Sequence, residues 1–140
     1  EEYNLSLKDT DWPQSTLTFG YAQSMLLTFQ NEGNVHLIPH GRIEVRDMFN
    51  RLVSKGVINV SSLYIFPSSR RQISVDLLRI DKSYPLSINT VSITGQDSLK
   101  KTTFIHKETF VYVNPLFMLV LTTIIGLIVF KKRLWGKRKS

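Results

Sequence analysis

SMLLTFQNEGNVHLIPHGRIEVRD, residues 24–47, combines two strand patterns with a connection between them. Residues 24–30 are mostly apolar, and residues 41–47 alternate polar and apolar side chains. Successive side chains of a strand point to opposite faces, so the alternation predicts one buried face and one face in water. The segment therefore predicts two strands of a β-sheet.

The connection between these strands carries residues that favour turns. Asn31, Gly33 and Asn34 predict a turn that requires positive φ angles, because these residue types adopt that conformation at low cost. Pro39 and Gly41 predict a crossover between the strands. We assign all five a structural role. The alternative is a binding loop, since loops at the end of a sandwich commonly contact partners.

Further strand patterns follow along the chain. Residues 70–77 alternate in the same way, and residues 86–93 alternate with a change of phase that predicts a β-bulge. Shorter strands are predicted at residues 3–7, 57–60 and 63–66, and a last strand ends at Val113. Short strands with a turn signal about every ten residues are typical of an antiparallel sandwich. The predicted fold class is therefore an all-β sandwich in residues 1–113.

An uncharged segment of 22 residues, from Thr109 to Phe130, follows. A helix of that length would rise about 33 Å at roughly 1.5 Å per residue, which matches a hydrocarbon core of about 30 Å. Residues 109–113 are β-branched and aromatic and favour a strand, whereas Asn114 and Pro115 favour an N-cap and a first helical residue. We predict one transmembrane helix that begins at Pro115 and continues beyond Phe130.

Basic residues follow the apolar segment directly. Six of the 18 Lys and Arg residues lie in the last ten positions, against three shortly before the segment. Because flanking positive charge stays in the cytoplasm, the chain is predicted to be a single-pass protein of the cell membrane with a cytoplasmic tail and an extracytoplasmic N-terminal domain. The predicted parts are a domain at 1–113, a transmembrane helix at 114–135 and a basic tail at 136–140.

The membrane anchor is predicted to use apolar, basic and aromatic side chains together. The basic side chains would reach the lipid headgroups, and the tryptophan would lie in the interfacial belt. The predicted anchor residues are Pro115, Phe130, Lys131, Lys132, Arg133 and Trp135.

A small surface occurs within the predicted helix. Thr122 and Gly126 have the small-xxx-small spacing that allows two helices to approach closely. These two residues are the candidates for helix packing, and the alternative is a span that remains monomeric. The sequence leaves the oligomeric state open.

Charge and cysteine content exclude several classes of protein. The formal net charge is +7, but nearly all of it lies in the tail, so the predicted domain is close to neutral and nucleic acid is not expected as a partner. The chain contains no cysteine, so an external domain depends on its hydrophobic core alone, which favours a bacterial surface. The sequence begins at Glu1 with neither Met nor an apolar leader, and we expect it to be the C-terminal part of a longer surface protein.

Few residues fit a catalytic or metal site, and we predict no catalytic residues, no cofactor, no metal ligands and no enzyme. His36 and His40 lie about 13 Å apart along an extended chain at roughly 3.3 Å per residue, so a metal site there requires a bend between them. Asp9 and Asp11 are a second candidate, for calcium, but calcium needs about six oxygen ligands. We favour a solvated turn there, with Trp12 packed on the edge of the domain.

The sequence LTFQNEGNVHLIPHGRIEVRDMFNRLV, residues 27–53, resembles the Asn-x-Gly-Asn-Val-His-x-x-Pro-x-Gly-x-Ile segment of membrane-anchored Ig-like surface proteins of bacteria, notably of the candidate phyla. It is more remotely similar to the WxL-interacting proteins of Gram-positive bacteria. The likeness extends to IFPSSRRQISVDL and the basic-tailed span, and covers about residues 17–135. Ser68 and Asn50 stand where that family has Gly, and the strand after Arg70 lacks the usual Trp.

This resemblance implies an Ig-like β-sandwich without known catalysis. The expected function is that of a membrane-anchored extracytoplasmic Ig-like module with a structural, adhesive or cell-envelope binding role. The expected partners are the lipid bilayer and a protein or cell-wall partner outside the membrane. The alternative is an accessory or sensory subunit of a membrane protein complex that contacts its partners through the span.

Overall fold

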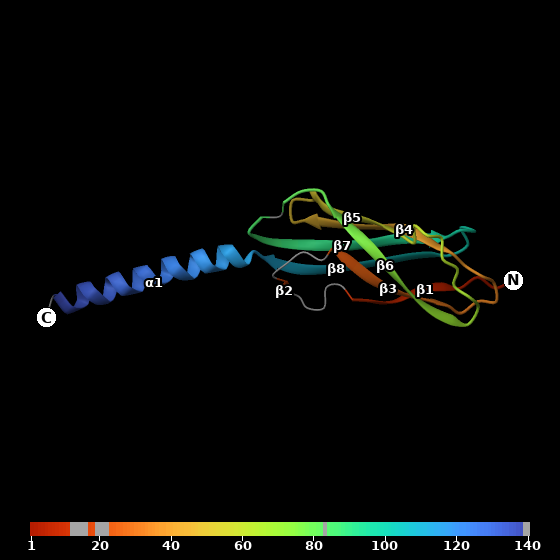
Figure 1. The fold of residues 1–140 in the computed structure, drawn as a ribbon, viewed down its shortest axis with the longest axis horizontal. Helices are drawn as coiled ribbons and strands as arrows, with labels where there is room; N and C mark the ends of the chain where they lie inside the picture. The colour runs from red at the N-terminus through yellow and green to blue at the C-terminus, as the bar shows by residue number, and fades with distance from the viewer. Residues whose placement is uncertain (12–16, 19–22, 83, 139–140) are drawn as a thin grey trace.

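The computed structural model describes residues 1–11, 17–18, 23–82 and 84–138 of the chain. Figure 1 shows an elongated body of strands, with the N-terminus at one end and a single helix leaving the opposite end. The elements in chain order are β1 (Leu5–Thr10), β2 (Leu17–Thr18), β3 (Ser24–Asn31), β4 (Pro39–Asp47), β5 (Leu52–Ile58), β6 (Ser69–Arg79), β7 (Leu86–Asp97), β8 (Thr103–Val113) and α1 (Pro115–Arg138).

The strands form two layers that share one strand. The order of the strands is β1-β3-β6-β5-β4-β7-β8-β2. β6 pairs with β3 from Ser69 to Asp76 and with β5 from Leu77 to Arg79, so it passes from one sheet to the other. Among the described strands, only the two-residue pairing of β2 with β8 is parallel. The predicted all-β fold, an Ig-like antiparallel sandwich followed by one C-terminal helix, is confirmed.

Apolar side chains that alternate inward fill the space between the layers. Phe29 of β3 meets Phe104 of β8 edge to face, with ring centroids 5.0 Å apart. Alternation in β4 and β6 has the predicted phase, because Ile43 and Val45, and Ile73 and Val75, are buried. The remaining members of this core are Leu5, Met25, Leu27, Leu37, Ile58, Ile65, Val91, Ile93, Phe110 and Tyr112.

The change of phase in residues 86–93 is not the predicted bulge. β7 pairs with β4 and with β8 without any shift of register. Instead, polar Ser87 and Asn89 point inward and are buried, whereas apolar Leu86 and Ile88 point outward and are about half exposed. The strand is continuous, and its polarity is inverted at the end nearest α1.

Two short strands were predicted in the wrong place. β5 covers Leu52–Ile58 rather than residues 57–60, and residues 63–66 contribute only an isolated bridge between Leu37 and Ile65. The reason is Asn59, which has a φ of 57°, in the left-handed region, and so ends the strand. Its buried side chain donates to the carbonyl oxygens of Pro39 and Leu63.

The connection from β3 to β4 is the predicted crossover, but its turn has a different mechanism. Gly33 has no positive φ. It is required by close approach, because a Cβ there would lie 2.2 Å from the carbonyl oxygen of Glu2. The side chain of Asn31 organises the turn: Nδ2 donates to the carbonyl of Val35 at 2.7 Å, and Oδ1 accepts from the Gly33 amide at 3.0 Å.

The other three predicted turn residues have separate roles. Asn34 accepts a hydrogen bond from the Glu2 amide at 2.7 Å and so fixes the N-terminal segment. Pro39 is the first residue of β4, where a strand tolerates proline. Gly41 lies within β4 opposite Gly95 of β7, and not in the connection itself.

Left-handed backbone occurs at both positions where the resemblance expected from the sequence predicts glycine. Asn50 has a φ of 62° and Ser68 a φ of 55°. A residue other than glycine costs roughly 1–2 kcal/mol in this conformation. Replacement by glycine removes that cost, but the greater freedom of glycine in the unfolded chain offsets part of the stabilisation. We therefore expect Ser68→Gly to raise the free energy of unfolding by about 1 kcal/mol in urea titrations of the full chain in mild detergent.

Ser74→Gly is the matched control for this variant, because Ser74 is an exposed serine within β6. It should lower the free energy of unfolding by about 0.5–1 kcal/mol, as glycine does in a strand. A loss of stability in Ser68→Gly as well would contradict the expected relief at Ser68.

Candidate functional site at the helix end of the sandwich

The junction between β8 and α1 is fixed by Asn114. Its Oδ1 accepts a hydrogen bond from the Leu116 amide at 2.9 Å, which is the predicted N-cap, and Pro115 is the first helical residue. The Asn114 amide donates to the carbonyl of Pro85 at 2.8 Å. The start of the helix is therefore tied to the connection between β6 and β7.

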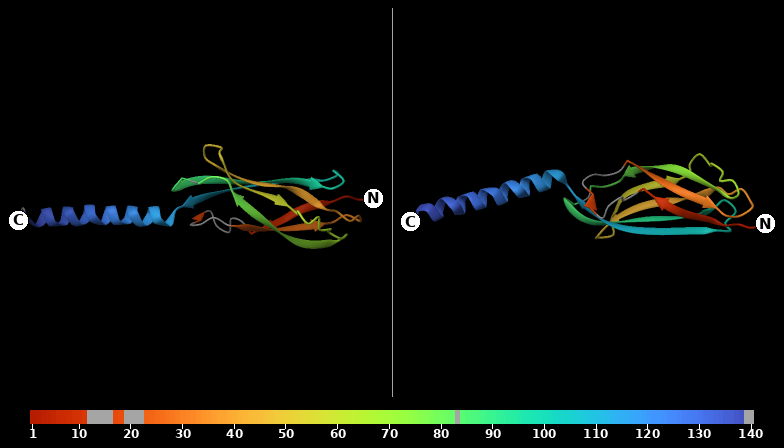
Figure 2. Two further views of the ribbon diagram at one scale, coloured as in Figure 1. Left: turned by 45° about the horizontal axis from the view of Figure 1, so that its top comes forward. Right: turned by 90° about the horizontal axis from the view of Figure 1, so that it is seen from below.

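The apolar part of α1 makes almost no contact with the sandwich. The segment Pro115–Leu134 has 20 residues with a mean hydropathy of 1.9, none of it buried, and is long and apolar enough to cross a membrane. Both views of Figure 2 show the helix projecting away from the strands. Phe130, Lys131, Lys132 and Arg133 are exposed along it, and the helix continues past Trp135. No change of secondary structure therefore marks the predicted boundary at residue 136.

The predicted helix-packing residues lie on an open surface. The Thr122 hydroxyl donates to the carbonyl of Leu119 at 2.9 Å, so its hydrogen bond is made within the helix. A Cβ added to Gly126 would meet no atom within 4 Å. Room for a second helix exists at this position, and self-association stays a prediction.

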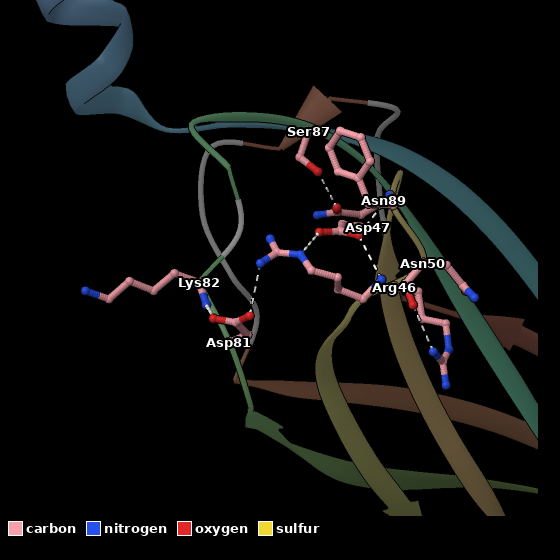
Figure 3. Close-up of polar contacts among 9 residues, drawn as sticks. Arg46, Asp47, Asn50, Asp81, Lys82, Ser87 and Asn89 are labelled. Carbon is pink, nitrogen blue, oxygen red and sulfur yellow. Dashed lines mark hydrogen bonds and ion pairs between the residues drawn. The ribbon is translucent and has the colours of Figure 1, made fainter.

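At the same end of the sandwich, Asp47 holds the hairpin between β4 and β5 (Figure 3). Its Oδ1 accepts from the amides of Phe49 and Arg51, each at 2.9 Å, and its Oδ2 accepts from Arg51 Nε at 2.8 Å. The backbone closes the turn as well, because the Asp47 amide donates to the Arg51 carbonyl at 3.0 Å. With Asn50 in the left-handed region, the hairpin tip is locked in one conformation.

Arg51 links this hairpin to the connection between β6 and β7. One guanidinium nitrogen lies 3.2 Å from a carboxylate oxygen of Asp81, and the guanidinium carbon lies 4.6 Å from the ring centroid of Tyr84. Figure 3 marks the ion pair at Asp81 with a dashed line. The ring of Tyr84 in turn packs edge to face against Phe49, at 5.4 Å between centroids. Two loops far apart in the sequence thus form one surface.

Polar groups continue behind the hairpin into the sandwich. Asn89 is opposite Asp47 in the pairing of β7 with β4, and its Oδ1 accepts from the Ser87 hydroxyl at 2.7 Å. Asn89 Nδ2 is buried and has no partner among the described residues. Buried polar groups usually make hydrogen bonds, and Ser87 and Asn89 meet this requirement only in part, through the bond between them.

The pKa of Asp47 is lowered. Burial acts to raise the pKa, but the hydrogen bonds from Arg51 and Phe49 and the positive charge of Arg51 outweigh it. A carboxyl group with a lowered pKa in the folded state adds stability above the ordinary pKa of aspartate, about 4, and that stability is lost as the pH falls through the lowered value.

Carboxylates of this kind titrate between about pH 5 and pH 1. We therefore expect the free energy of unfolding of the natural chain to fall as the pH is lowered through this range, and that of Asp47→Asn to fall less. Asparagine retains an oxygen acceptor for the two amides and removes the titrating charge. Urea titrations of both proteins across this range measure the difference. Parallel curves for the two proteins would show that Asp47 does not contribute to the pH dependence.

Exposed apolar side chains surround this cluster. Met48, Phe49, Tyr84 and Leu86 are 42–64% exposed, and we call these four residues the apolar collar. With Pro85 and with Phe117 of α1 they line a depression of about 430 Å³. The collar and the first turn of the helix are therefore one continuous surface.

A groove of about 840 Å³ lies where β5 and β6 diverge. The Leu77 amide donates to the carbonyl of Gln23, so the backbone groups of Leu77 point toward β3. Backbone groups of successive residues in a strand point to opposite edges. The amide and carbonyl groups of Gln72 and Ser74 therefore point away from β3 and into the groove. Val57 and Leu78, each 62% exposed, are among the apolar residues that line it. The groove thus offers a strand edge beside an apolar surface.

The predicted candidates for metal binding have structural contacts. His36 packs against the ring of Phe66 at 5.1 Å between centroids, Asp9 Oδ1 accepts from the Thr10 amide, and Asp11 Oδ1 accepts from the Leu26 amide. Within the described ranges, no three His, Cys, Asp or Glu side chains form a group that could hold a metal ion. Trp12 lies outside the described residues.

Comparison with known proteins gives distant likenesses in shape alone. No family model matches the sequence, and no curated protein matches it. A crystal structure of the periplasmic chaperone SfaE is similar with a TM-score of 0.43 and 6% sequence identity, over 81% of this chain. The match spans 57% of the length of that chaperone chain, and a likeness this low transfers no activity.

Proposed function

We propose that the chain is a membrane-anchored module that holds an Ig-like sandwich outside the cell, in a structural, adhesive or envelope-binding role. The observation that carries this proposal is the exposed apolar helix Pro115–Leu134, of which no part is buried by the sandwich. Apolar surface of this extent is unfavourable in water, and a bilayer core of about 30 Å removes it from water along its length. The basic residues at its C-terminal end favour a cytoplasmic tail.

The groove between β5 and β6 is the part of the sandwich best suited to a protein partner. An extended segment can add to a free strand edge through main-chain hydrogen bonds, while neighbouring pockets select its side chains. The edge at Gln72 and Ser74 and the apolar side chains of Val57 and Leu78 provide both features. This groove gives the proposed binding role a location away from the membrane anchor.

Two single-cysteine variants test the anchoring and its direction. The natural sequence has no cysteine, so Ser61→Cys, in an exposed turn, and Ser140→Cys, in the tail, each carry one thiol. The protein should remain with membranes after alkaline carbonate extraction. A membrane-impermeant maleimide should label Ser61→Cys on intact cells, and Ser140→Cys only after permeabilisation. Release of the protein by carbonate, or the reverse labelling, would contradict the proposal.

Exchange of the span distinguishes an anchor from a complex subunit. In a variant with polyleucine in place of residues 115–130 and an unchanged tail, an anchor retains its partners in pull-downs from mild detergent. If membrane proteins are pulled down with the native span but not with polyleucine, the chain is a subunit that binds its partners through the helix. The proposal of an anchor alone would then be wrong.

A further inference from the structure

We propose that the apolar collar is inserted in the outer interfacial region of the lipid bilayer, so that the sandwich is seated on the membrane rather than held above it. This inference rests on the proposed membrane anchor and adds a second contact surface, on the sandwich itself. Its starting point is the depression that the collar shares with Phe117 of α1.

The position of Phe117 along the helix sets the depth of the collar. The segment Pro115–Leu134 is about 30 Å long at 1.5 Å per residue, equal to the thickness of the hydrocarbon core, so Pro115 lies at its outer boundary. Phe117 is two residues further and lies about 3 Å inside that boundary. Side chains that share a depression with Phe117 therefore lie at the level of the headgroups, in a layer about 5–8 Å thick.

The chemistry of the collar fits this layer. Phe49 is 64% exposed, Leu86 54%, Met48 50% and Tyr84 42%, and they form a contiguous patch instead of isolated side chains. Aromatic side chains with a polar edge, such as Tyr84, are common at the membrane interface. The inverted polarity of β7 adds apolar surface at this end of the sandwich, because Leu86 and Ile88 point outward and Ser87 points inward.

The collar is also rigid enough to hold its position. Asp47 fixes the backbone of the hairpin tip that carries Met48 and Phe49, and Arg51 joins this tip to the connection that carries Tyr84. The Asn114 amide ties the same connection to the start of α1. The helix and the collar therefore enter the bilayer as one unit, and little ordering is needed on insertion.

Three single-cysteine variants of the full chain in phosphatidylcholine vesicles test this inference. Each is labelled with an environment-sensitive nitrobenzoxadiazole dye: Leu121→Cys in the span, Phe49→Cys in the collar, and Phe66→Cys as control. Phe66 is also an exposed phenylalanine, 57% against 64% for Phe49. It precedes the start of β6, where Ser69 pairs with Asn31 of β3, and Asn31 pairs with Leu5 near the N-terminus, at the end of the sandwich opposite α1. Lipids with a quencher at the headgroup and aqueous iodide report the two environments.

We expect headgroup quenching of the Phe49→Cys dye to be several-fold stronger than that of the Phe66→Cys dye, and iodide quenching to be weaker. If Leu121→Cys is in lipid but Phe49→Cys is quenched by iodide as strongly as Phe66→Cys, the inference is wrong and the anchor stands. Protection of Phe49→Cys from both quenchers would identify a protein contact, and would also overturn the inference. If Leu121→Cys itself is in water, the proposed anchor fails.

A second variant excludes insertion driven by the dye. Met48→Cys keeps Phe49 in place, and its dye should show the same headgroup quenching. Adding Phe49→Ser and Leu86→Ser should reduce that quenching several-fold, whereas adding Phe66→Ser should not change it. Equal quenching in all three proteins would show that the collar does not drive insertion.

Discussion

Replacement of Phe29 by alanine should lower the free energy of unfolding by about 3–5 kcal/mol, the largest loss expected from a single core truncation in this sandwich. Phe29 is fully buried, and its ring meets Phe104 edge to face at 5.0 Å. The loss of buried apolar area accounts for about 1.5–3 kcal/mol, and the aromatic pair and the remaining cavity account for the rest.

Because single domains are stable by about 5–15 kcal/mol, this loss should lower the urea midpoint of the Phe29→Ala protein clearly below that of the natural chain. Near-ultraviolet circular dichroism of the full chain in mild detergent follows the loss of aromatic packing in the sandwich. Phe49→Ala is the matched control: the same atoms are removed from a side chain that is 64% exposed. Equal losses in the two variants would show that Phe29 is not part of the packed core.

The strands with one wet face were predictable from their own sequence. In β4 and β6, the side chains that alternate toward the core are apolar and the others polar, so periodicity alone assigns the faces. The helix was predictable for a simpler reason, because its apolar length and the Asn114 cap are both local features. The resemblance to bacterial surface proteins, by contrast, stays a prediction.

Features that depend on distant segments were not predictable in this way. Ser87 and Asn89 point inward in a strand that pairs with β4 and β8 without a shift of register, so a rule that places apolar residues inside assigns the wrong face. The pairing of Arg51 with Tyr84 joins two loops that no sequence pattern connects. The only local signal was the acid and base four residues apart, Asp47 and Arg51, at the end of a strand.

Glycine positions show the same limit. Sequence patterns predicted positive φ angles near Gly33, whereas the left-handed residues of the described turns include Asn50, Asn59 and Ser68. Gly33 and Gly41 are glycines because another segment passes too close for a Cβ. Close approach between segments is a property of the folded chain, and no local rule for turns can detect it.

Replacement of Gly41 by alanine is the sharpest test of such close approach. A Cβ at Gly41 would lie 2.3 Å from the carbonyl oxygen of Thr94 and 2.7 Å from the Cα of Gly95, both backbone atoms of β7. Rotation of a side chain cannot relieve a clash between backbone atoms. The strands β4 and β7, which are central in the order β5-β4-β7-β8, would therefore have to separate. We expect a loss of about 3 kcal/mol in the free energy of unfolding, at the upper end of the cost of overpacking.

Alanine also restricts the unfolded chain, which alone would stabilise the protein by about 0.4–1 kcal/mol, so the sign of the result depends on the clash. Gly126→Ala makes the same chemical change where no atom lies within 4 Å, and it should leave the unfolding of the sandwich unchanged. If Gly41→Ala is as stable as the natural chain in the same urea titration, β4 and β7 can separate without cost, and their tight pairing does not support the sandwich. A loss confined to Gly41→Ala would instead show that backbone contact between these strands is what requires glycine.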